Sequence, residues 1–272
     1  MRSLALNQST CKKKDIIKFI KIAKDFQGIE LNFEQLNSSI SEELSLKDIF
    51  EYFSIYDLRL INLFQLEDFS LCSDTKFKTV IIPTLKKMMN YCYKLECNML
   101  SVVPSFESRN IPQWKILRRT IEKLEKIAKI AYKEGIRIGF EVVNLPNSSI
   151  PTLKEAKKVL SPLKSQENLG YIVDTFYLGK SEVDPENLLE IIDYIYLIRL
   201  ADLIKRDRET TKLIEDEQRL LPGKGNFNFE KFFPITKRYY KNYFSLKLSE
   251  KSCQNTVYKK FLRTINYFKW II

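Results

Sequence analysis

The chain has 272 residues, of which 44% are hydrophobic and 29% charged, and its formal net charge at pH 7 is +11. This length fits one large α/β domain or two small ones, and the apolar runs are too short to span a membrane. Histidine is absent, which excludes Ser-His-Asp catalysis, papain-like chemistry and zinc sites that rely on imidazole. Any acid–base chemistry must therefore use Asp, Glu, Lys, Tyr or Cys.

The cysteine pattern indicates a reducing environment. Five cysteines are present and none has a paired metal-ligand spacing: Cys11, Cys72, Cys92, Cys97 and Cys253. In a chain this long we expect small buried or half-buried thiols rather than a disulfide framework. The N-terminus also lacks the apolar segment of a signal peptide, so a cytoplasmic location is predicted.

Strand-like and helix-like segments alternate along the chain. Apolar segments predict strands at 3–7, 28–33, 58–66, 98–104, 135–144, 169–175, 195–202 and 244–248. Helical spacing of apolar residues predicts helices at 14–26, 45–57, 74–95, 112–134, 152–163, 185–193, 227–243 and 256–272. Ser45 and Thr152 are suited to cap two of these helices, and Pro83 is expected to kink or divide a third.

Eight strands that alternate with helices predict a (β/α)8 TIM barrel, an α/β fold formed here by a single domain over residues 1–272. A doubly wound open sheet is the alternative, but it favours a glycine-rich phosphate turn after the first strand. The chain has only seven glycines and no such turn. The segment 203–218 is rich in charge and poor in apolar residues, and we expect a charged excursion from the barrel there.

Four charged residues come at the ends of the last four predicted strands: Glu141, Asp174, Arg199 and Lys247. Strand C-termini of a barrel converge on one face, where active sites of this fold lie, so these side chains should share one pocket. A carboxylate at the tip of a buried strand needs a cation, a metal or a substrate beside it. The alternative is a self-neutralising ion-pair cluster without chemistry.

Three short stretches give the chain a family resemblance: 139–144 (GFEVVN), 173–177 (VDTFY) and 219–229 (RLLPGKGNFNF). In this order the stretches resemble the xylose-isomerase-like TIM-barrel superfamily. That group includes sugar isomerases, ketose 3-epimerases, inosose dehydratases and endonuclease-IV-type repair enzymes. The motifs are most similar to the ketose 3-epimerase branch, in which Glu141 would be followed three residues later by the matching Asn144.

The resemblance implies a metal site that this chain has partly lost. In the family, a divalent metal is held by a Glu on strand five, an Asp on strand six, a His on strand seven and a Glu on strand eight. Glu141 and Asp174 match the first two, whereas Arg199 and Lys247 stand at the other two positions. Neither cation has a lone pair for a metal, and both would repel one. We therefore expect no metal and no other cofactor.

The same resemblance implies the remaining site residues. Tyr177 stands where the family has a substrate-binding His, and Arg219 matches the family arginine that precedes the Pro-Gly turn. With Asn144, Asp174 and Arg199, these residues are expected to bind a small sugar-like or anionic ligand. Glu141 and Lys247 are the catalytic candidates. If the protein is an enzyme, the resemblance implies an isomerase or epimerase of a sugar or polyol.

Three outcomes stay open for the chemistry. Arg199 or Lys247 could stabilise an enediolate oxygen while Glu141 acts as the base, without a metal. Lys247 could instead form a Schiff base with a ketose. The barrel could also be catalytically inactive and retained for binding or assembly.

The basic excess lies at the two ends of the chain. Residues 231–272 contain ten Lys or Arg against one Glu, and residues 11–24 contain six Lys against one Asp. In a closed barrel the last helix lies beside the first, so these ends could form one positive outer wall. Such a wall could bind nucleic acid or an acidic partner, or be an ordinary solvated surface. A homo-oligomer is also compatible with the sequence.

Overall fold

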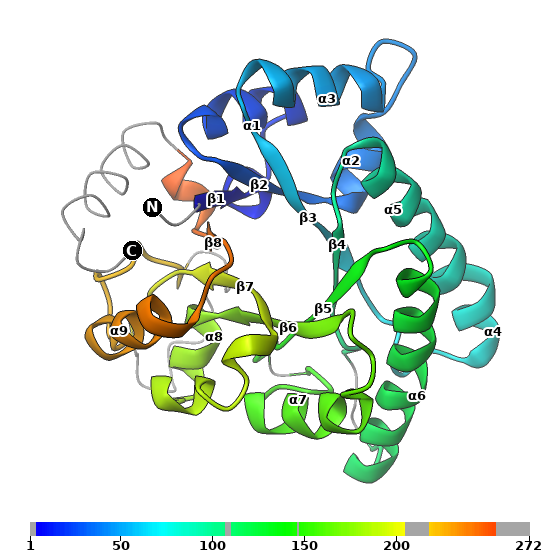
Figure 1. The fold of residues 1–272 in the computed structure, drawn as a ribbon, viewed down its shortest axis with the longest axis vertical. Helices are drawn as coiled ribbons and strands as arrows, with labels where there is room; N and C mark the ends of the chain where they lie inside the picture. The colour runs from blue at the N-terminus through cyan, green and yellow to red at the C-terminus, as the bar shows by residue number, and fades with distance from the viewer. Residues whose placement is uncertain (1–3, 107–109, 146, 205–217, 254–272) are drawn as a thin grey trace.

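A closed barrel of eight parallel strands forms the centre of the computed structural model, which describes residues 4–106, 110–145, 147–204 and 218–253. Each strand pairs with its neighbours in sequence, and β8 pairs with β1 to close the ring. Figure 1 shows the strands at the centre with the helices around them. The strands are β1 (Leu4–Asn7), β2 (Gly28–Asn32), β3 (Arg59–Leu66), β4 (Met99–Val102), β5 (Arg137–Glu141), β6 (Leu169–Asp174), β7 (Ile195–Leu200) and β8 (Phe244–Leu246). The predicted TIM barrel is confirmed.

Nine α-helices lie in the described part of the chain: α1 (Ile16–Ile22), α2 (Phe33–Ser39), α3 (Leu46–Ile55), α4 (Asp74–Lys76), α5 (Ile82–Lys94), α6 (Gln113–Tyr132), α7 (Leu153–Leu160), α8 (Thr175–Lys180) and α9 (Phe229–Tyr239). Ser45 and Thr152 cap their helices, as predicted, and each completes a capping box, with Asp48 and with Glu155 respectively. None of the helices in these described ranges has the length and apolar character needed to cross a membrane.

The strands separate two environments. Ile29 and Leu31 of β2 are fully buried in the main apolar core, together with residues of the surrounding helices. Glu30, between them, hydrogen-bonds instead to side chains of other strands. Because successive side chains of a strand point to opposite faces, Glu30 faces the inside of the barrel. The barrel interior is therefore partly polar.

Several helices differ from their predicted form. The helix expected over 74–95 is interrupted by a π-helical turn at Phe77–Ile81, directly before Pro83. Proline lacks an N–H, so the preceding turn must find a different hydrogen-bond pattern. The helix expected over 185–193 is two short 3-10 turns, Pro185–Leu188 and Ile192–Tyr194. The short helices α2 and α8, which directly follow β2 and β6, were not predicted. The expected helix at 256–272 and most of the excursion at 203–218 lie outside the described residues.

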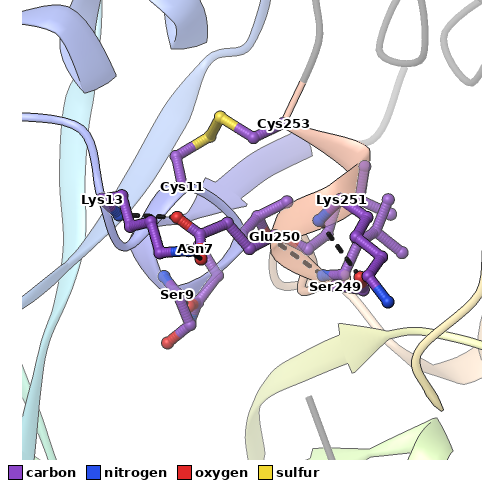
Figure 2. The surroundings of a disulfide bond; sticks show 11 residues. Asn7, Ser9, Cys11, Lys13, Ser249, Glu250, Lys251 and Cys253 are labelled. Atoms are coloured by element: carbon purple, nitrogen blue, oxygen red, sulfur yellow. Dashed lines mark hydrogen bonds and ion pairs between the residues drawn. A yellow bond between two sulfur atoms is a disulfide. The ribbon is translucent and has the colours of Figure 1, made fainter. Parts of the chain in front are cut away.

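The cysteine prediction is wrong for one pair. Cys11 and Cys253 form a disulfide whose Cα atoms are 5.3 Å apart, although 242 residues separate them in sequence (Figure 2). Cys11 ends the 3-10 turn after β1 and Cys253 follows the turn after β8. Closure of the barrel brings these two turns together, which no local spacing reveals. Cys72, Cys92 and Cys97 are buried free thiols, as expected.

Candidate functional site

A buried arginine lies between two glutamates inside the barrel. Arg199 of β7 donates from Nε and Nη2 to the carboxylate of Glu30, with Nη2–Oε2 at 2.6 Å. Its Nη1 forms a short ion pair with Oε1 of Glu141, at the end of β5. The Arg199 side chain is 1% exposed and the two carboxylates at most 3%. The guanidinium of β7 therefore links β2 and β5 across the barrel interior.

Polar side chains from three further strands complete the environment of Glu30. Its carboxylate accepts hydrogen bonds from Asn7 and Asn62, both at 2.8 Å, and from Ser245 at 2.5 Å. Burial alone would raise the pKa of Glu30, but Arg199 and these donors hold it below its ordinary value. The carboxylate is thus ionised and satisfied on every side.

Glu141 connects this pair to a lysine at the barrel mouth. Lys247, just after β8, places Nζ 3.6 Å from Glu141 and 3.9 Å from Asp174. Burial opposes ionisation of Glu141, but Arg199 and Lys247 outweigh it and lower its pKa to about 2. Burial lowers the pKa of Lys247; Glu141 partly offsets this, while Arg219 and Arg199 lower it further.

A second arginine neutralises the strand-six carboxylate. Arg219 donates from Nη1 to Oδ1 of Asp174 at 3.1 Å, and its Nη2 lies 2.9 Å from Oδ2. Its guanidinium carbon also lies 4.4 Å from the ring centre of Phe176 and 5.1 Å from that of Tyr177. Stacking and pairing together fix the plane of Arg219.

Asp202 holds the turn that follows Arg219. Its carboxylate accepts backbone hydrogen bonds from Leu203, Gly225 and Phe227 at 2.8, 2.7 and 3.0 Å. Asp202 also pairs its backbone with Leu220. The stretch 220–227 is therefore tied to the end of β7, so it carries Arg219 into the cluster as a fixed element.

The structure brings most of the predicted site together, with one exception. Glu141, Asp174, Arg199, Arg219 and Lys247 form one cluster, and Tyr177 lies beneath Arg219. Asn144 instead donates a hydrogen bond to Ser181, in the segment after α8, at 2.6 Å.

Glu30 was not predicted from the sequence as a member of the site, so the predicted number of charged groups in the cluster was too small. Three carboxylates (Glu30, Glu141, Asp174) face three cations (Arg199, Arg219, Lys247), rather than two facing two. A signal was present in the sequence: β2, β3, β4 and β8 each place a polar residue between apolar neighbours, at Glu30, Asn62, Ser101 and Ser245. All four side chains are fully buried.

The donor set fits a divalent metal poorly. Among the described residues, no group of three or more Asp, Glu or Cys side chains could hold a metal ion. The carboxylates that could serve as ligands are already paired with Arg199, Arg219 and Lys247. A dication placed between them would lie within a few ångströms of fixed positive charges.

A further carboxyl lies near the mouth. Partial removal from water raises the pKa of Glu67, and the nearby charges of Glu34, Glu141 and Asp68 raise it further, while Lys247 opposes them. Glu67 follows β3 and accepts a short hydrogen bond from Gln65. Its raised pKa contrasts with the lowered pKa values of Glu30 and Glu141, so Glu67 protonates more readily than either of them.

Some basic residues near the C-terminal end of the chain form ion pairs within the protein. Lys247 belongs to the barrel mouth, and Lys231 pairs with Asp184 at 2.8 Å and Glu186 at 3.1 Å. The last four basic residues of the C-terminal segment lie outside the described residues. Binding of nucleic acid or an acidic partner by these ends stays a prediction.

Comparison with known proteins gives one family match and several curated relatives. The family described as "Xylose isomerase-like TIM barrel" matches residues 20–265. An inosose isomerase of Bacillus velezensis is 27% identical over 188 residues, 68% of this chain and 65% of that protein. An inosose isomerase of Bacillus subtilis is 26% identical over 58% of this chain, and the match spans 55% of its length. The inosose isomerase of Halalkalibacterium halodurans is 21% identical over 86% of this chain and 83% of that protein.

Solved structures share the fold at lower identity. The IolI protein, described with a bound zinc atom, superposes with a TM-score of 0.86 and 21% identity over 99% of both chains. D-psicose 3-epimerase from Clostridium cellulolyticum H10 gives a TM-score of 0.78 and 11% identity, again over 99% of both chains. At these identities the superpositions establish the barrel fold alone.

Proposed function

Because the chain belongs to the xylose isomerase-like TIM-barrel family, we propose that it is a sugar isomerase/epimerase relative that functions without a divalent metal. Its C-terminal barrel face would bind a small polyhydroxy or anionic ligand. The observation that carries the proposal is the guanidinium of Arg199, which lies between Glu30 and Glu141.

The burial of Arg199 supports the absence of a metal. A metal ion could gain these carboxylates only by displacing the arginine from two fully buried partners. Separating one member of such a buried pair costs about 3 to 5 kcal/mol. Lys247 and Arg219 would repel the same ion from the other side.

Lys247 is the group best placed to meet a ligand. Its side chain is 12% exposed, whereas Glu30, Asp174, Arg199 and Arg219 are 0 to 1% exposed. Its ion pairs, at 3.6 and 3.9 Å, are longer than hydrogen bonds. An ammonium has three donors, so these remain for a ligand hydroxyl, carbonyl or anionic oxygen.

The electrostatics favour binding over proton abstraction at this site. A carboxylate with a pKa of about 2, as at Glu141, is a weak base near neutral pH. Its Oε1 is also paired with both Arg199 and Lys247. Glu141 would therefore orient Lys247 for the ligand, and Glu67 would be the group able to exchange a proton at the rim.

The metal part of the proposal is tested on the purified protein by elemental analysis and by calorimetric titration with Mn²⁺ and Zn²⁺. We expect no stoichiometric metal in the wild-type protein. The double variant Arg199→His with Lys247→Glu supplies the donors that the family resemblance implies, and we expect it to gain metal binding. Arg118→His with Lys129→Glu makes the same exchanges on the exposed face of α6 and serves as the control. Stoichiometric metal on wild-type protein at the barrel cluster contradicts the proposal.

The ligand part is tested separately, in the presence of EDTA. Inososes, ketoses and their phosphates are titrated calorimetrically against wild-type, Lys247→Met and the exposed control Lys237→Met. We expect binding of at least one compound that is lost in Lys247→Met alone. Borohydride trapping with mass spectrometry, and product analysis, reveal whether a Schiff base or an epimer forms. No binding by any compound, or equal binding by all three proteins, contradicts the ligand assignment.

A further inference from the structure

The opposite end of the barrel contains a cavity of about 470 Å³. It lies where β3, β4, β5 and β7 begin, and it is therefore at the N-terminal face, away from the ion cluster. Its lining includes Ile61, Met99 and Leu197, which belong to a small apolar cluster inside the barrel. This face of a TIM barrel ordinarily serves stability, and the volume is in the range of small-molecule sites.

Two arginines line this cavity without a carboxylate partner among the described residues. Arg59 begins β3 and is exposed, and Arg137 begins β5 and is half-buried. The strand between them contributes Asn98, whose Oδ1 accepts from Nη2 of Arg137 at 3.2 Å. The acid that lines the same cavity is Glu96, so the charges of the lining sum to a positive value.

Arg137 is held in place, but one of its buried N–H groups has no hydrogen-bond partner among the described residues. Its guanidinium carbon lies 5.0 Å from the ring centre of Tyr196, a cation–π contact that fixes its plane. Its Nε is buried and has no hydrogen-bond partner in the described part of the structure. A guanidinium has five N–H donors in a planar fork, and a buried donor without a partner requires an explanation.

The walls of the cavity indicate the rest of the ligand. The half-buried rings of Phe50, Tyr196 and Tyr243 form the aromatic part of the lining, among polar side chains that include Asn98 and Asn242. Planar or apolar rings pack well against such walls. The arginines provide the geometry that recognises a carboxylate with two parallel hydrogen bonds.

We propose that this N-terminal cavity is a second ligand site, which binds a small organic carboxylate with an aromatic or apolar body through Arg137 and Arg59. The site is independent of the C-terminal ion cluster, and its occupant differs from a polyhydroxy ligand in needing an apolar body.

Benzoate is the probe, titrated calorimetrically against the full chain, with the neutral isostere benzamide beside it. We expect saturable benzoate binding and at least about tenfold weaker binding of benzamide, since the hydrogen bonds to charged groups are lost. Arg137→Gln and Arg59→Gln should each weaken benzoate about tenfold. Arg238→Gln is the matched control, because Arg238 stacks on the exposed Tyr239 at 5.2 Å and lines no part of this cavity.

Two further variants keep the test decisive if an arginine variant fails to fold. Glu96→Gln removes the negative charge of the lining and should tighten benzoate about twofold. Lys13→Met, an exposed position at the other end of the barrel, should leave benzoate binding unchanged. The proposal is overturned if benzoate shows no saturable binding or if benzamide binds equally well. Equal weakening by Arg238→Gln or Lys13→Met also overturns it.

Discussion

Replacement of Glu141 by glutamine tests the electrostatics of the ion cluster most directly. The pKa of this carboxyl falls from an ordinary 4.5 to about 2 in the folded protein. Each pKa unit corresponds to about 1.36 kcal/mol, so ionised Glu141 contributes about 3 kcal/mol to the free energy of unfolding at pH 7. Glu141→Gln keeps the shape and an acceptor for Arg199 but removes the charge, and we expect it to lose most of this amount.

The pH dependence gives a second, independent measure. Because the folded-state pKa is depressed, the contribution is fully present above pH 4.5 and is lost as the pH falls from about 4.5 to about 2. At pH 3.5 the wild-type protein should already have lost about 1 kcal/mol of it. The difference in the free energy of unfolding between wild type and Glu141→Gln should shrink by that amount, because the variant has no carboxyl at this position to protonate.

Urea unfolding followed by circular dichroism at pH 7, 5 and 3.5 provides the measurement. Glu122→Gln is the matched control, because Glu122 pairs with Arg118 on the exposed face of α6. An exposed pair at this spacing contributes about 0.3 to 0.5 kcal/mol. A loss below about 1 kcal/mol for Glu141→Gln at pH 7, or a gap that stays constant with pH, would refute the reasoning.

Three other predictions concern the framework of the barrel. Asp202→Ala leaves the amides of Leu203, Gly225 and Phe227 without their acceptor. We expect the free energy of unfolding to fall by about 2 to 3 kcal/mol and hydrogen exchange at Gly225 and Phe227 to become faster. Unchanged exchange at these two amides would contradict the prediction. Gly170→Ala should destabilise the protein more than Gly139→Ala in urea unfolding. The added Cβ would meet the rigid backbone oxygen of Tyr194 at 2.5 Å in the first variant, but the movable side chain of Ile172 at 2.6 Å in the second. The reverse order of stabilities would contradict this prediction. Cys253→Ser should lower the free energy of unfolding by up to about 5 kcal/mol, since the disulfide closes a loop of 242 residues; equal stability of oxidised wild type and variant would argue against it.

The sequence was informative wherever a property repeats locally. Alternation of strands and helices predicts the barrel, and position at a strand end predicts that Glu141, Asp174, Arg199 and Lys247 meet. Glu30 was not predicted because it lies mid-strand, and its partner Arg199 is 169 residues away. Which polar interior residues face each other depends on how the strands are staggered around the ring, and no single strand encodes that stagger.

Asn144 and the disulfide are two further features that local sequence patterns could not predict. Asn144 follows its strand by three residues, where the chain has already turned toward Ser181, so a strand-end rule no longer applies. Cys11 and Cys253 lie outside any local pattern, and only closure between β1 and β8 makes them neighbours. Contacts made by closure are the part of this fold that the sequence, taken segment by segment, does not reveal.

The disulfide also changes what a cut in the chain would do. The bond makes residues 11 to 253 a covalent macrocycle that contains seven of the eight strands, β2 to β8. Figure 2 shows the closure of this ring beside the ion pair of Lys13 with Glu250, where the two ends meet. Cleavage of any one peptide bond within the ring opens it but separates nothing. A protease-nicked molecule should therefore migrate as one species until it is reduced, and its two halves would remain a single molecule that can refold.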